Sequence, residues 1–108
     1  MEGEMILRTW RGRTRREDKD RYLAYLRETG VKEYKATPGN KGVFVACRER
    51  DGLSEFFLLT LWESMEAVQR FAGPEPESAV FYPEDEDFLV DKDDHVDHYE
   101  VLEAPVVG

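Results

Sequence analysis

The sequence is poor in the features that mark secreted, membrane and nucleic-acid-binding proteins. It has one cysteine, Cys47, so no intramolecular disulfide can form and the reducing cytoplasm is the expected compartment. No apolar run approaches the roughly 18 residues of a membrane helix, and the first four residues lack the positive charge of a signal peptide. Acidic residues outnumber lysine and arginine by 24 to 15, which argues against nucleic acid or a membrane as a partner.

Histidine is scarce as well, since the chain has only His95 and His98. They stand three positions apart in a segment predicted to be extended, where such positions point to opposite faces, so they are badly placed to share a metal ion. The chain also lacks a glycine-rich G-x-G-x-x-G phosphate loop. We therefore expect no metal site and no cofactor.

The remaining composition is that of a globular domain. A chain of 108 residues with 41% hydrophobic and 12% aromatic residues is large enough for a core of its own. We expect one domain over residues 1–108, with the folded core over residues 5–103. A monomer of this size buries only about two-thirds of the surface of its unfolded chain, so a further apolar face is more readily covered by association.

The first elements predicted are a strand and a helix. Residues 5–11 read as a strand with two alternating faces. Thr14 and Glu17 have the spacing of a capping box, which predicts a helix start at this point. Gly30 supplies a left-handed stop, and the helix then carries one apolar stripe made of Tyr22, Leu23, Tyr25, Leu26 and Thr29.

A hairpin is expected next. Residues 42–50 and 55–62 are rich in strand-forming residues, and Asp51-Gly52 between them is a strong turn signal. The second of these strands is apolar on both faces, with Phe56, Leu58, Thr60 and Trp62 on one and Phe57, Leu59 and Leu61 on the other. A strand with one solvent-exposed face would alternate apolar and polar residues. Both faces of this strand must therefore be covered.

The rest of the chain predicts a helix capped by Ser64, a short helix after Pro83, and a last strand from about 95 to 103. The order strand, helix, hairpin, helix, strand is the ferredoxin-like βαββαβ pattern. It predicts an α+β fold with a four-stranded antiparallel sheet and helices on one face. Two helices cannot cover both faces of the sheet, so we expect a homodimer in which a second copy covers the other face.

Several short motifs carry a resemblance to a known family. They are Trp10-Arg11-Gly12, Tyr22-x-x-Tyr25, Leu61-Trp62-Glu63-Ser64, Glu66-Ala67-Val68, Phe71-Ala72-Gly73 and His98-Tyr99-Glu100-Val101. Together they resemble the antibiotic biosynthesis monooxygenase-like family of dimeric α/β barrels, over about residues 5–103. The resemblance implies a dimer whose two sheets face each other, with a pocket in each subunit between its own sheet and helices.

Two branches of that family have known chemistry. The haem-degrading branch uses an Asn on the first strand, a Trp at the end of the third strand and a His on the following helix. Here Trp62 matches, but the first strand has Arg8 and Thr9, and residues 64–73 contain no histidine, so haem degradation is not expected. The other branch oxidises polyphenolic polyketides without metal or flavin and also has a Trp at the end of strand 3, which corresponds to Trp62.

Trp62 and Arg8 are candidate binding residues, and each has a structural alternative. The Trp62 ring is suited to a pocket wall with its N–H on a substrate oxygen, or to plain core with any partner for that N–H. Arg8 lies mid-strand, where a buried guanidinium needs an anion. That anion is either a substrate phenolate or carboxylate, or an acid of the chain such as Glu100.

His98 is the candidate catalytic base, because an imidazole that titrates near neutrality can remove a phenolic proton. Its structural alternative is a hydrogen-bonded histidine at the sheet edge or dimer interface. Trp10 on the Arg8 face and Tyr82 near the mouth complete the candidate binding site. The sequence thus suggests a cofactor-independent monooxygenase for an aromatic or polyketide-like molecule, with a non-catalytic dimeric binding or pathway-accessory domain as the alternative.

Overall fold

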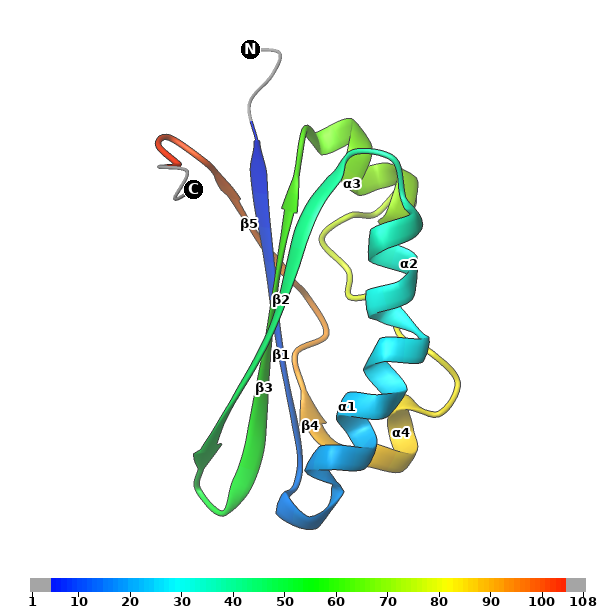
Figure 1. Ribbon diagram of the computed structural model, residues 1–108, viewed down its shortest axis with the longest axis vertical. Coiled ribbons are helices and arrows are strands. Elements are labelled where there is room, and N and C mark those ends of the chain that lie inside the picture. Colours follow the sequence, from blue (N-terminus) through cyan, green and yellow to red (C-terminus); the bar gives the residue numbers. More distant parts are fainter. Residues whose placement is uncertain (1–4, 105–108) are drawn as a thin grey trace.

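One antiparallel sheet organises the chain in the computed structural model, which describes residues 5–104 (Figure 1). Its strand order is β2-β3-β1-β4, and β5 also pairs with β1. The strands are β1 (Ile6–Arg15), β2 (Asn40–Arg50), β3 (Leu53–Trp62), β4 (Leu89–Lys92) and β5 (Asp97–Glu100). The expected last strand, residues 95–103, occurs as the shorter β5, and β4, which also pairs with β1, was not predicted.

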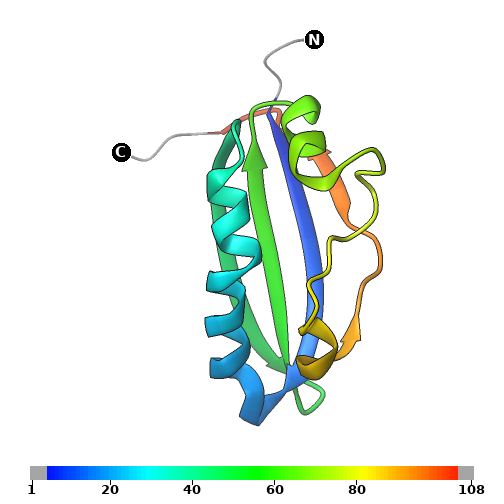
Figure 2. The ribbon, with the colours of Figure 1, turned by 90° about the vertical axis from the view of Figure 1, so that its right-hand side faces the viewer.

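The helices all lie on one side of this sheet, as Figures 1 and 2 show. They are the 3-10 turn η1 (Arg16–Asp18), α1 (Lys19–Glu28), α2 (Gly30–Ala36), α3 (Met65–Ala72) and α4 (Asp85–Phe88). This arrangement confirms the predicted α+β, ferredoxin-like class. Among residues 5–104, none of these helices has the length and apolar character needed to cross a membrane.

The predicted start of the first helix is wrong. Thr14 belongs to β1, and its hydroxyl donates to the carbonyl of Arg15 rather than capping a helix. The strand continues to Arg15 because it pairs with β3 as far as that residue. The helix therefore begins later, at Lys19, after the Asp18 carboxylate has paired with Arg15 and Arg21.

The predicted stop at Gly30 is also wrong. A kink at Thr29, with φ −117° and ψ −95°, separates α1 from α2, and Gly30 is the first residue of α2. The Thr29 hydroxyl donates to the carbonyl of Tyr25 across this kink. The helical layer thus extends to Ala36 and brings Tyr34 over the sheet, although Tyr34 lies beyond the predicted helix stop.

Two local predictions are confirmed. Asp51 and Gly52 both have positive φ, 55° and 78°, as a tight turn between β2 and β3 requires. The Ser64 side chain accepts a hydrogen bond from the N–H of Ala67 at 3.1 Å, so it caps α3 as expected.

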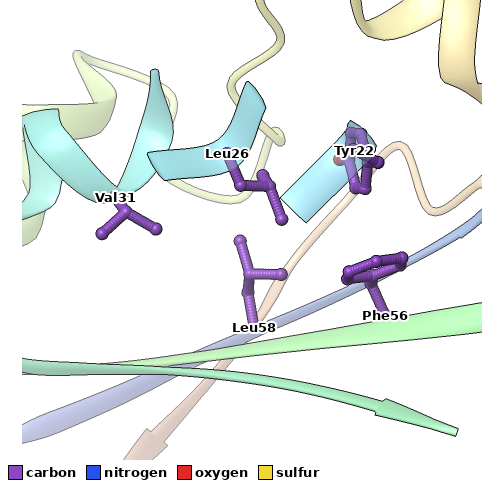
Figure 3. Close-up of a cluster of buried hydrophobic side chains, with 5 residues drawn as sticks. All are labelled: Tyr22, Leu26, Val31, Phe56 and Leu58. Carbon is purple, nitrogen blue, oxygen red and sulfur yellow. The ribbon is translucent and has the colours of Figure 1, made fainter. Parts of the chain in front are cut away.

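The main core lies between α1, α2 and the helix-covered face of the sheet. Figure 3 shows that Tyr22, Leu26 and Val31 point from the helices toward Phe56 and Leu58 on β3. All five side chains are at most 8% exposed. A second cluster, under α3, contains Trp62, Ala67 and Val68.

The opposite face of the sheet carries apolar residues that none of the helices of residues 5–104 covers (Figure 1). Leu59 lies between Thr9 on β1 and Phe44 on β2 in the register, and Phe44 is 67% exposed. Phe57 and Leu61 are on the same face and are partly exposed. We call these four residues, Phe44, Phe57, Leu59 and Leu61, the open face. The homodimer that would cover it stays a prediction.

Candidate functional site

A small cavity lies between the sheet and the helices, where the pocket is expected. Its volume is about 30 Å³, and β1, β3, α1, α2 and residues 79–96 contribute to its wall. The lining residues include three of the predicted binding residues, Arg8, Trp10 and Tyr82. Thr60, Tyr34 and Val96 line it as well.

Arg8 is a buried cation in this wall, with 4% of its surface exposed. Its Nη1 donates to the carbonyl of Pro76 at 2.9 Å and its Nη2 to the carbonyl of Ser78 at 3.2 Å. The register places His98 opposite Arg8. Burial lowers the pKa of Arg8 from its usual range, and the charge of Glu77 opposes that shift. A guanidinium held mainly by neutral carbonyls retains affinity for an anion.

His98 lies beside Arg8, with 3.4 Å between its Nε2 and the Nη1 of Arg8. It is not among the residues that line the cavity. Burial, followed by the positive charge of Arg8, lowers the pKa of His98, so the imidazole is neutral at pH 7. A neutral imidazole can accept a proton, but here one ring nitrogen faces a cation. Its role as a catalytic base stays a prediction.

Trp62 is fully buried in the cluster under α3. Its Nε1 donates to Oγ1 of Thr60 at 2.7 Å, and its ring packs against Phe71 and Tyr34. Thr60 is the residue of this pair that reaches the cavity wall. The indole N–H therefore has an internal partner, and the proposed part of Trp62 in binding remains a prediction.

Trp10 forms another part of the wall and is fixed from two sides. Its Nε1 donates to the carbonyl of Asp93 at 2.7 Å, and its ring meets Phe81 edge to face at 6.3 Å. The ring also lies over Gly12, where an added Cβ would come within 2.3 Å of Cη2. Gly12 thus leaves the space in which the indole lies, a contribution that was not predicted.

Two tyrosines line the cavity from the helical side. Tyr82 was predicted as a binding residue, and its hydroxyl donates to Oε1 of Glu33 at 2.9 Å. Tyr34 was not predicted, because α2 was not. Burial raises the pKa of Tyr34 to about 12, although the charge of Arg8 acts in the opposite direction, so its hydroxyl stays protonated at neutral pH.

No family model matches the chain, and no curated protein matches it. Several solved structures do match the chain. A Bacillus cereus protein provisionally named an antibiotic biosynthesis monooxygenase is 21% identical over 97% of this chain and 100% of its own, with a TM-score of 0.67.

Two further structures agree. A Chloroflexus aurantiacus protein with the same provisional name is 18% identical over 96% of this chain and 97% of its own, with a TM-score of 0.58. A Shewanella oneidensis protein is 11% identical over 92% of each chain, with a TM-score of 0.68. This chain has their fold. Identities this low carry the fold alone, so activity has to be argued from the site.

Proposed function

We propose that the chain is a member of the antibiotic biosynthesis monooxygenase-like family that binds a small aromatic anion in the cavity between sheet and helices. One observation carries the proposal: a buried arginine faces the cavity and is held there by carbonyl oxygens. A substrate phenolate or carboxylate would give Arg8 a charged partner. The aromatic rings of Trp10 and Tyr34 and the side chain of Leu26 suit a planar apolar body.

We further propose oxidation of that ligand by dioxygen without a cofactor. An ionised aromatic substrate passes one electron to dioxygen, and the resulting radical pair combines into a peroxide at carbon. Loss of water then converts a CH₂ group into a carbonyl, so dioxygen supplies the ketone oxygen and the oxygen of one water. Arg8 would stabilise the substrate anion, and neutral His98 would accept the proton.

The second candidate is a non-catalytic binding or accessory domain. It is favoured by the position of His98, whose Nε2 faces the Arg8 guanidinium and whose side chain does not line the cavity. In that case the same anion would bind, and no oxygen would be consumed. The fold fits both candidates equally.

A homodimer is part of both candidates. The open face holds Phe44, Phe57, Leu59 and Leu61 outside the helical layer, and apolar surface of this kind usually marks an interface. We propose that the open face of a second copy covers it.

The decisive experiment follows dioxygen consumption and ligand binding together, with a panel of phenols and anthrones. Wild-type protein is expected to bind at least one member and to consume dioxygen with it. Arg8→Met should lose binding, whereas Arg13→Met, which removes an arginine from the other face of the same strand, should keep it. His98→Gln should bind without turnover.

The negative results are equally informative. Binding without dioxygen consumption by wild-type protein supports the non-catalytic candidate. If no panel member binds, or if Arg8→Met binds as well as wild type, the proposed anion site is wrong.

A further inference from the structure

The residues between α3 and α4, 73–84, form a segment that closes one side of the cavity, and we call it the lid. Figure 2 shows it in yellow, running beside the orange strands β4 and β5. Ala79, Val80 and Tyr82 of the lid line the cavity. The lid is therefore placed where a ligand would have to pass or be accommodated.

Backbone pairing holds the lid to residues 94–96. The N–H of Val96 donates to the carbonyl of Glu77, and the N–H of Ala79 donates to the carbonyl of Asp94, each at 2.9 Å. Ser78 and His95 form an isolated antiparallel bridge between these two hydrogen bonds. This pairing is short, so it provides limited stability alone.

Arg8 anchors the same stretch from inside the molecule. Its two hydrogen bonds end on the carbonyls of Pro76 and Ser78, on either side of Glu77. Pro76 is itself buried. The group that we propose as the anion receptor is thus also the internal anchor of the lid.

The closed cavity is too small for the proposed ligand. Its volume is about 30 Å³, whereas an apolar cavity that takes up benzene measures about 150 Å³. Binding of an aromatic molecule therefore requires part of the wall to move. The lid and Val96, to which the lid is hydrogen-bonded, are the parts of the wall outside the helices and strands.

We infer that Arg8 is a latch: an aromatic anion that binds it replaces the carbonyls of Pro76 and Ser78, and the lid is released by the same exchange. The exchange is favourable because a carboxylate or phenolate adds the attraction between two full charges, which the neutral carbonyls of Pro76 and Ser78 do not offer to the guanidinium. A neutral ligand of the same shape offers no such replacement. The latch therefore selects for anions and links their binding to lid opening.

The identity of the ligand rests on the proposed function, but the latch does not, so the first arm of the test uses protein without ligand. Amide hydrogen exchange is followed at Ala79 and Val96, whose N–H groups join the lid to residues 94–96. Arg8→Met should accelerate exchange at both amides by about tenfold, the factor for loss of one or two ordinary hydrogen bonds. Amides in the pairing of β2 with β3 should be unaffected.

Two variants keep this arm decisive. Arg8→Lys retains the charge, so its exchange rates at the two amides should lie between those of wild type and Arg8→Met. It takes the place of Arg8→Met if that variant does not fold. Tyr82→Phe removes the hydrogen bond to Glu33 at the other end of the lid. It should leave the exchange rates of the Ala79 and Val96 amides unchanged. Equal exchange in wild type and both Arg8 variants overturns the latch.

The second arm adds 2-naphthoate or neutral 2-naphthamide to the wild-type protein. The carboxylate should accelerate exchange at Ala79 and Val96, and the amide should not. Slower exchange with bound carboxylate would overturn the inference, because it would mean that the ligand tightens the lid. If neither compound binds while the first arm succeeds, the latch stands and the proposed ligand class fails.

Discussion

Arg8 on β1 and His98 on β5 occupy opposite positions in the register, and the nearest nitrogens of their side chains are 3.4 Å apart. Arg8 is a cation throughout the neutral and acidic range and His98 becomes one in acid, so protonation of His98 places two positive charges in one partly buried location. The charged groups that act on His98 are Arg8, Glu77 and Asp97. Burial and the charge of Arg8 outweigh the two carboxylates, so the pKa of His98 falls below its ordinary value near 6.5.

This relationship predicts a loss of stability in mild acid. The unfolded chain takes up the His98 proton at higher pH than the folded protein does, so the contribution of His98 is complete above about pH 6.5. It is lost as the pH falls from there toward the lower pKa of the folded state. Urea unfolding at several pH values between 5 and 8 measures this effect. As the pH falls, the free energy of unfolding should decrease less for His98→Gln than for wild type. Parallel curves for the two proteins would contradict the shift.

The open face predicts a dimer of about 25 kDa, twice the chain mass of 12.6 kDa. Leu59→Asp places a charge on that face and should give a folded monomer in sedimentation equilibrium. Leu58→Asp is the matched control, since Leu58 is 4% exposed and faces the helices, so it should prevent folding. A dimeric Leu59→Asp of unchanged stability would exclude the open face as the interface.

Gly12→Ala is expected to destabilise the protein by about 1–3 kcal/mol, because the new methyl group would overlap the Trp10 ring. Gly42→Ala is the control, since a Cβ added there has no neighbour within 4 Å. Chemical unfolding measures both variants, and the emission of Trp10 should change only for Gly12→Ala. An equal, small effect of both substitutions would mean that the indole moves aside freely.

Trp62→Phe tests the two roles open to that residue. Because the side chain is fully buried and its N–H bonds to Thr60, we expect stability to fall by about 1–3 kcal/mol. Trp10→Phe, which alters the cavity wall itself, should change the affinity for an aromatic ligand more strongly. If Trp62→Phe instead weakens binding more than it lowers stability, Trp62 belongs to the binding site.

The fold was predictable because its decisive signals are local. The Asp51-Gly52 turn sets the register of β2 and β3, and Ser64 begins α3. The helix start predicted at Thr14 was wrong because the pairing of β1 with β3 continues past this residue. Several hydrogen bonds between the strands outweigh the one hydrogen bond of a helix cap. The helix stop predicted at Gly30 was wrong for a related reason, because packing of Val31 against the core favours continuation of the helix.

The site was predictable where one strand face determines it. Alternation alone predicts that Arg8 and Trp10 share a face of β1, whereas the structure determines that this face lies toward the helices. Tyr34 was not predicted as a site residue because the helix that carries it, α2, was not predicted. The carbonyls of Pro76 and Ser78 were not predictable, because a backbone acceptor carries no residue signature and its position depends on how the lid folds back.

The two edges of the sheet differ in how they are protected from pairing with another chain. On one side, β4 and β5 have four residues each, and the lid covers the gap between them. On the other side, β2 is an edge strand of 11 residues with charged residues near both ends. Between them, residues 43–47 form an uncharged run, Val-Phe-Val-Ala-Cys, with strong strand propensity. This run is therefore where aggregation of partly unfolded protein would begin.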